Sequence, residues 1–212
     1  MVRELVGGVL LCCLLAACAP KVEWTPGPVI TERPTPSAAT PTAAGSGSVT
    51  PAPATPAPLT VPDATGAIDA TAFESAHFAS PSGRIWCAVH EDWALCHFPR
   101  GMNASNVPTS EEVCPGAELD VTGVSVIETA DYFCSGGAES LPQTNGLYVG
   151  WWKKAKLPSV TYDGQKLAVL PYGRKIAKGS YVCASEKAGI TCGNPTTGKG
   201  FRVALAGVDL IG

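Results

Sequence analysis

The sequence predicts an all-β fold, a small disulfide-braced barrel or sandwich, over residues 69–212. Short segments of β-type residues alternate there with Gly, Pro and Asn, a pattern typical of strands joined by tight turns. Six of the nine cysteines lie in the same part of the chain, which is dense enough to brace a small domain. Helical composition is weak, and only residues 69–77 show it.

Three hairpins are expected in this domain. Residues 84–89 and 93–98 form the first, with Glu91-Asp92 in the turn. The second joins 159–162 to 165–170 through Asp163-Gly164, which suits a type I′ turn because glycine accepts a positive φ. The third joins 181–184 to 190–193. Residues 201–206 follow the turn PTTGKG and are expected to pair beside the third hairpin.

The N-terminus has the features of a lipoprotein signal peptide over residues 1–17. Arg3 precedes an apolar run from Leu5 to Ala17 that is too short for a stable membrane span. Small residues then precede Cys18, the pattern that lipoprotein signal peptidases cut. Acyl chains on Cys18 would anchor the chain to the extracytoplasmic face of the cell membrane. The alternatives are an ordinary secretory signal cut near Ala17 or Ala19 and an uncleaved anchor helix.

Residues 18–62 read as a disordered tether rich in Pro, Thr and Ala. Eleven of the nineteen prolines of the chain lie there, and such a segment has little apolar surface to bury. Polyproline II geometry would extend it by about 3.1 Å per residue. Its Thr-Pro repeats are candidate O-glycosylation sites.

Cysteine counting agrees with export. Cys12 and Cys13 would leave with the signal peptide and Cys18 would carry lipid, so an even set of six remains. Six cysteines allow fifteen pairings. The Cys87–Cys96 and Cys183–Cys192 pairs both enclose eight residues that resemble a hairpin, which would place the two cysteines of each pair opposite each other. These two pairs are expected as disulfides, and Cys114–Cys134 follows by elimination.

Charge is distributed unevenly along the domain. Twelve acidic residues stand against only Arg84 and Arg100 between Asp63 and Glu139, whereas residues 141–212 hold ten basic and three acidic residues. Either the two halves pack together and neutralise each other, or the basic half faces anionic headgroups or an acidic polymer. The net charge of −3 does not indicate a nucleic-acid partner.

Residues that could carry chemistry are few. Cys87, His90, Cys96 and His97 are of the right type for zinc, but opposed cysteines outside the cytoplasm form a disulfide first. No catalytic residue, metal or cofactor is therefore assigned. A hydrolase using His77 or His97 with a nearby carboxylate is the competing interpretation. Ser135-Gly136-Gly137 and Thr197-Gly198-Lys199-Gly200 are both interpreted as turns.

Neighbouring aromatic and basic residues are the candidate binding residues. Trp151 and Trp152 are expected on opposite faces of a strand, one in the core and one outward. An outward tryptophan with nearby cations would suit a sugar or a lipid headgroup. The full candidate set is Trp151, Trp152, Lys153, Lys154, Arg174 and Lys175.

Three stretches carry a family resemblance: FASPSGRIWC, LPYGRKIAKGSYVCASEKAGITC and NPTTGKGFRVAL. Together with the order of the six cysteines, they resemble an uncharacterised domain of secreted proteins and lipoproteins of actinobacteria, including mycobacteria. The resemblance covers nearly all of residues 78–205. The closing GVDLIG and the Ser135-Gly136-Gly137 that follows Cys134 depart from the family pattern. The resemblance implies fold and location, and it brings no known activity.

Together these features predict a membrane-anchored lipoprotein that presents a non-enzymatic binding domain in the cell envelope. Its expected partners are the membrane itself, through the lipid, and a cell-wall glycan, an anionic lipid or an envelope protein. The alternatives are the envelope hydrolase and a structural accessory subunit of a larger complex. An exposed apolar patch would indicate the accessory subunit.

Overall fold

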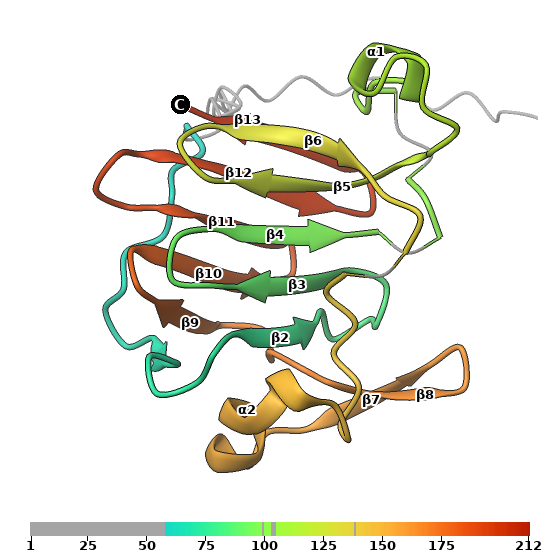
Figure 1. Ribbon diagram of the computed structural model, residues 1–212. Helices are drawn as coiled ribbons and strands as arrows, with labels where there is room; N and C mark the ends of the chain where they lie inside the picture. The colour runs from blue at the N-terminus through green and yellow to red at the C-terminus, as the bar shows by residue number, and fades with distance from the viewer. Residues whose placement is uncertain (1–57, 99, 103–104, 138) are drawn as a thin grey trace, which may run out of the picture. The chain divides into compact units, whose positions relative to one another are not determined.

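The computed structural model describes residues 58–212 apart from 99, 103–104 and 138. Two mainly antiparallel sheets pack face to face (Figure 1). The expectations for residues 1–57, namely the signal peptide, the lipid on Cys18 and most of the tether, lie outside the described residues. Among the described residues, no helix is long and apolar enough to cross a membrane.

The first sheet has five strands in the order β2-β3-β4-β5-β6, so each strand lies beside its neighbour in sequence. Short turns between sequential strands produce this arrangement. The strands are β2 (Ala76–Ala79), β3 (Trp86–Val89), β4 (Ala94–His97), β5 (Val121–Val126) and β6 (Ala130–Cys134). A four-residue helix, α1 (Ser110–Val113), lies between β4 and β5.

The second sheet has six strands in the order β1-β9-β10-β11-β12-β13. All its pairings are antiparallel except that of β1 with β9, which is parallel. The strands are β1 (Ile68–Asp69), β9 (Arg174–Lys178), β10 (Tyr181–Glu186), β11 (Gly189–Asn194), β12 (Lys199–Ala204) and β13 (Gly207–Ile211).

One core lies between the two sheets. Phe78 and Val124 of the first sheet and Ile176 and Phe201 of the second are all fully buried in it. Among the described residues neither sheet closes on itself, since each has an open strand order with a different edge strand at either end. The domain is therefore a sandwich and not a closed barrel, which resolves the two alternatives that the sequence left.

The three expected disulfides are present. Cys87–Cys96 joins β3 to β4 and Cys183–Cys192 joins β10 to β11, with each pair directly opposite in the strand register. The third bond, Cys114–Cys134, ties the end of α1 to β6. Pairing in register places two Cα atoms within reach of a disulfide, so hairpin geometry was sufficient to predict the first two bonds, and the third followed by elimination.

A separate hairpin extends beyond the two sheets. It consists of β7 (Ser159–Tyr162) and β8 (Gln165–Ala168). The central residues of its turn, Asp163 and Gly164, have φ of 52° and 74°, the positive values of the expected type I′ turn.

The strand expected at Trp151 and Trp152 is wrong, because residues 150–155 form the helix α2 (Gly150–Ala155) after the short 3₁₀ segment η1 (Leu147–Val149). Lys156 ends the helix in the left-handed region with φ of 51°. α2 lies beside β2, an edge strand of the first sheet (Figure 1). Covering a sheet edge is a tertiary requirement, and local composition does not reveal it.

Residues 69–77 do not form the helix that their composition suggested. Ile68 and Asp69 pair with β9, and the Asp69 carboxylate accepts a hydrogen bond from the Thr71 N–H at 2.8 Å. That local bond makes a turn instead of a helix start. The chain then enters β2 at Ala76.

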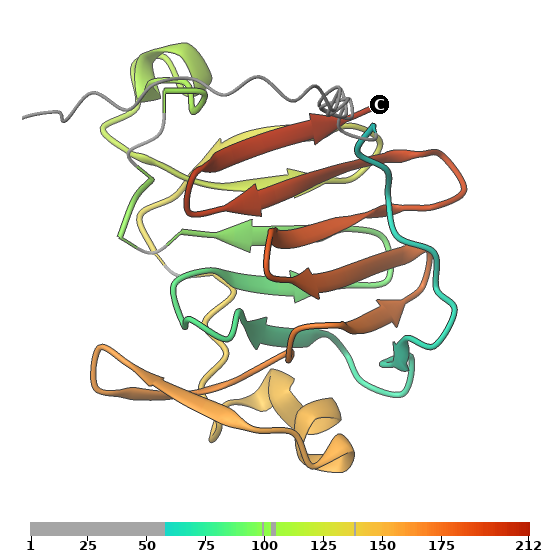
Figure 2. The same cartoon turned by 180° about the vertical axis from the view of Figure 1, so that it is seen from behind.

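The chain contacts the domain before β1 begins. Figure 2 shows residues 58–67 running across the outside of the six-stranded sheet. Val61 lies against Gly193 and Gly200, where an added Cβ would fall 2.7 and 2.9 Å from its methyl group. The Asp63 carboxylate binds the Lys175 ammonium at 3.1 Å. The packed part of the chain therefore includes residues ahead of 69.

Ion pairs join the acidic half of the domain to the basic half. Lys175 binds Asp63, Lys178 binds Glu91 at 3.1 Å, and Arg100 binds Asp163 at 2.6 Å. Each pair joins residues that lie far apart in sequence. Part of the charge polarity is thus neutralised within the fold, and Lys175 and Lys178 belong to this neutralised part.

Candidate functional site

Turns from both sheets meet at one end of the sandwich (Figure 1). They are the β2–β3, β10–β11 and β12–β13 turns, the segment that leaves β4, the tip of the β7–β8 hairpin, and the segment between β8 and β9 that carries Tyr172. Two cavities lie there, and Leu205 lines both of them. We call the two cavities together the end groove.

The larger cavity, the cationic lobe, has a volume of about 560 Å³. Its lining combines aromatic, aliphatic and guanidinium groups. The lining residues are Arg84, Phe98, Arg100, Gly101, Met102, Tyr162 and Leu205. A mixed lining with a few charged groups is typical of small-molecule sites.

The Tyr162 ring is held firmly in the wall of the cationic lobe. It packs on Gly83, where an added Cβ would lie 2.7 Å from the Tyr162 Cβ and where φ is +76°. The Trp86 ring meets the Tyr162 ring edge-on at 6.5 Å, and the Trp86 indole N–H donates to the Gly83 carbonyl at 2.7 Å. Glycine at 83 is thus required for both the turn and the close approach.

The two arginines of the cationic lobe differ in their partners. The Arg100 guanidinium lies 5.6 Å from the centre of the Tyr162 ring and binds Asp163. Its hydrogen bond to Asp163 raises the pKa of Arg100, so it stays charged. Arg84 has no ion-pair partner among the described residues, and its guanidinium remains available to an anion.

The smaller cavity, the apolar lobe, has a volume of about 300 Å³. Ile85 and Ile190 are buried and lie at its base, while Tyr172 and Leu205 are 47 % and 56 % exposed and form its sides. Glu186 and Lys187 carry opposite charges at its rim. Both lobes fall within the roughly 300–1,000 Å³ range of ligand pockets.

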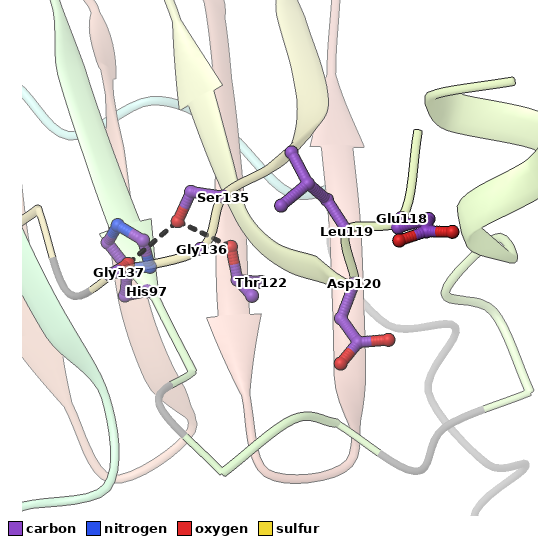
Figure 3. Close-up of a pocket in the computed structure, with 8 residues that line it drawn as sticks. All are labelled: His97, Glu118, Leu119, Asp120, Thr122, Ser135, Gly136 and Gly137. Carbon is purple, nitrogen blue, oxygen red and sulfur yellow. Dashed lines mark hydrogen bonds between the residues drawn. The ribbon is translucent and has the colours of Figure 1, made fainter. Parts of the chain in front are cut away.

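A third cavity, of about 370 Å³, lies beside His97 (Figure 3). The His97 ring is buried, and its Nε2 accepts a hydrogen bond from the Glu139 backbone N–H at 3.3 Å. The Glu139 carboxylate lies 4.0 Å from the same nitrogen, which is too far for a hydrogen bond. Burial lowers the pKa of His97 to about 4, against a smaller opposing effect of the Thr122 backbone.

Ser135 lines the same cavity but is not arranged as a nucleophile. Its hydroxyl donates to the Gly137 carbonyl at 2.7 Å and lies 3.1 Å from the Thr122 hydroxyl (Figure 3). A serine hydroxyl has one proton to donate, and here the proton is directed to a carbonyl and not to His97. Ser135 and His97 therefore do not form the hydrogen-bonded nucleophile and base that acyl transfer requires.

His77 is not arranged for acid–base catalysis either. It is buried, and its ring lies 4.7 Å from the Tyr148 ring and 5.9 Å from the His90 ring. Among the described residues, neither of its ring nitrogens has a well-aligned hydrogen bond. Burial lowers its pKa to about 4, with a smaller lowering by His90 and a slight opposing effect of the Leu141 backbone. Its nearest ring neighbours are thus aromatic, whereas the hydrolase interpretation requires a carboxylate.

The candidate binding residues from the sequence do not line the end groove. Trp151 is 1 % exposed, and its indole N–H donates to the His77 carbonyl at 3.1 Å, so it belongs to the core. The Trp152 indole N–H donates to the Pro158 carbonyl at 2.8 Å. Both indoles are oriented by the helix and loop geometry that replaced the expected strand.

The four basic candidates lie on two elements. Lys153 and Lys154 are exposed on α2, and Arg174 is exposed at the start of β9. Lys175 forms an ion pair with Asp63. Lys153, Lys154 and Arg174 therefore remain available to an anionic surface.

Sequence reasoning missed the end groove because its residues come from six separated segments. One signal was present: Arg84 and Arg100 are the only Lys or Arg residues between Asp63 and Glu139, and both line the cationic lobe. Two isolated cations in an acidic stretch indicate a local requirement for positive charge. The sequence does not show that the two side chains meet.

Fold and cavities together define a disulfide-braced β-sandwich with a groove at its turn-bearing end. Comparisons with protein-family models, with curated proteins and with solved structures find no match.

Proposed function

We propose that this chain is a bacterial lipoprotein, anchored through Cys18 to the extracytoplasmic face of the cell membrane, whose folded domain binds a ligand without catalysing a reaction. The observation that carries the binding function is the end groove, with Tyr162 fixed in its wall and two guanidinium groups beside apolar side chains. Anchoring is supported by the sequence around Cys18.

The construction of the groove suits recognition. Four of its turns belong to hairpins, namely β2–β3, β7–β8, β10–β11 and β12–β13. The Cys183–Cys192 disulfide closes the β10–β11 hairpin that supplies Glu186 and Lys187. Walls fixed by strands and disulfides are already formed before a ligand arrives. In a preformed site, less of the binding free energy is lost in ordering the side chains of the site.

Three partner classes fit an envelope location: a cell-wall glycan, an anionic lipid and an envelope protein. Lys153, Lys154 and Arg174 support a second, weaker contact with anionic headgroups, because each lysine or arginine near an anionic membrane contributes about 1 kcal/mol. Such a contact would hold the domain close to the membrane without selecting a ligand.

In-cell photocrosslinking of the full chain tests the binding function. A photoreactive residue replaces Leu205 in the end groove, and in the control it replaces Leu147, which is 88 % exposed and lines neither lobe. We expect a discrete product from position 205 and none of the same mass from 147. Identical product patterns from both positions would contradict a binding site in the groove.

Anchoring is tested separately by metabolic labelling with a palmitate analogue. Wild-type chain should take up the label and partition with the membrane, whereas Cys18→Ala should do neither. Equal labelling of both chains would contradict the lipid on Cys18. Because this test does not involve the groove, its outcome is independent of ligand binding.

A further inference from the structure

We propose that the ligand of the end groove is a single-chain lipid with a singly charged anionic head, for which a long-chain carboxylate is the simplest example. This inference rests on the proposed binding function and names the chemical class that the groove selects. Its basis is that a cationic cavity and an apolar cavity adjoin, with the Leu205 side chain lining both.

Continuity of the two lobes determines the shape of the ligand. Arg84 lines the cationic lobe, and the next residue, Ile85, lines the apolar lobe. Leu205 lies on the other side, in the β12–β13 turn, and is 56 % exposed. One molecule that passes Leu205 would contact both lobes. One of its ends would contact the arginines and the other the aliphatic side chains.

The net charge of the cationic lobe determines the charge of the head group that it binds. Arg84 and Arg100 contribute two positive charges and Asp163, which binds Arg100, removes one, so one positive charge remains. A guanidinium has five N–H donors, and a single carboxylate oxygen of Asp163 leaves most of those on Arg100 unused. A monoanionic head therefore balances the charge and reaches donors from both arginines.

The apolar lobe determines the tail and its orientation. Ile85 and Ile190 at its base are 3 % and 1 % exposed, and the Tyr172 ring and Leu205 face the space above them. The opposite charges of Glu186 and Lys187 at the rim offset each other, so the apolar lobe has no net positive charge to compete with the arginines for the anionic head. The head therefore lies at the arginines and the hydrocarbon chain in the apolar lobe, where burial contributes about 0.8 kcal/mol per methylene.

Other ligand classes match fewer of these features. An acidic glycan would use the arginines and the Tyr162 ring but would leave the aliphatic base of the apolar lobe uncovered. A neutral lipid would fill the apolar lobe and leave Arg84 without an anion. Only an amphiphile with a negative head uses both lobes.

The test uses the chain from residue 19 to its end, secreted so that its disulfides form, with dodecanoate as the probe. Binding is measured by isothermal titration below the micelle concentration. Dodecanol supplies the same chain without charge, acetate the head alone, and dodecyltrimethylammonium the opposite charge. We expect dodecanoate to bind at least tenfold more tightly than each of these three.

Two pairs of matched variants locate the site. Arg84→Gln should weaken dodecanoate about tenfold, as expected for the loss of a charge-assisted hydrogen bond, and should change dodecanol binding by less than twofold. Leu205→Gln should weaken both ligands. The controls Lys199→Gln and Leu147→Gln remove a charge and a leucine outside the groove and should change neither. Arg84→Lys should retain most of the affinity for dodecanoate.

The outcomes separate the lipid from the binding function. Equal affinity for dodecanoate and dodecyltrimethylammonium, or equal losses in Arg84→Gln and Lys199→Gln, would overturn the lipid inference. If dodecanoate fails to bind while the crosslinked product from position 205 persists, the groove has a ligand of another class and only the lipid inference falls. If position 205 also gives no product of its own, both proposals fall.

Discussion

The Cys96 sulfur lies 3.9 Å from the Cys192 sulfur on the facing sheet. Each belongs to a hairpin disulfide, and all four sulfur-bearing residues are 0 % exposed. The two disulfides are therefore packed against each other in the centre of the sandwich. They contribute to the core as apolar side chains in addition to linking strands.

This contact predicts which disulfide matters most. Chain entropy alone predicts a larger stabilisation from the longer loop. It gives about 3.3 kcal/mol for Cys114–Cys134 and about 2.7 kcal/mol for Cys87–Cys96, whose sequence separations are 20 and 9 residues. Replacing Cys87 and Cys96 by alanine also opens a cavity between the sheets, at a cost of about 2 kcal/mol. The Cys87→Ala/Cys96→Ala variant should be the less stable one in urea unfolding. Greater instability of Cys114→Ala/Cys134→Ala would show that sulfur packing is unimportant.

Acid should destabilise the domain through its buried histidines. His77 and His97 have pKa values of about 4 in the folded chain and ordinary values near 6.5 when unfolded. Between these values the unfolded chain binds more protons, so stability is lost as the pH falls from about 6.5 to about 4. Each histidine contributes up to about 3 kcal/mol to that loss.

Urea unfolding at several pH values between 7 and 4.5 measures the effect. In His97→Gln, which keeps a hydrogen-bond acceptor for the Glu139 N–H, the pH dependence should become clearly smaller. His77 and His90, whose pKa values are also lowered by burial, account for the part that remains. Asp63, whose hydrogen bonds to Thr65 lower its pKa to about 2, titrates below this range. A pH dependence that is the same in wild type and His97→Gln would refute the assignment.

Gly83 should be far more sensitive to substitution than a glycine with the same backbone angle in open space. Gly83→Ala incurs about 1 kcal/mol for its positive φ and also displaces the Tyr162 ring, which lies where the new methyl group would be. Gly198→Ala has nearly the same φ, 71°, and meets nothing within 4 Å. Thermal unfolding should show a clearly larger loss for Gly83→Ala. Similar losses would mean that Tyr162 moves freely aside.

Trp151→Phe should lower stability without affecting ligand binding. The change removes the indole N–H that donates to the buried His77 carbonyl and leaves a partial cavity, for a loss of about 2 kcal/mol or more. Trp152→Phe is the control, because its indole is only partly buried beside Pro158. Loss of binding in folded Trp151→Phe would instead place the ligand near α2.

The sequence by itself determined the all-β class, the three disulfides, three of the hairpins and the type I′ turn at Asp163-Gly164. Apart from the Cys114–Cys134 bond, which followed by elimination, each of these depends on residues close together in the chain: alternation within a strand, a turn of two residues, or two cysteines with eight residues between them. Such local features predict the same structure whatever the fold of the rest of the chain.

Tertiary structure decided the rest. Whether the strands form a sandwich or a barrel depends on which faces meet, and the helix at Trp151 forms where the edge strand β2 requires cover. The end groove exists because turns and connecting segments from six separate parts of the chain converge at one end of the sandwich. No local pattern encodes that convergence, since the distance between Arg84 and Leu205 is set by the packing of two whole sheets.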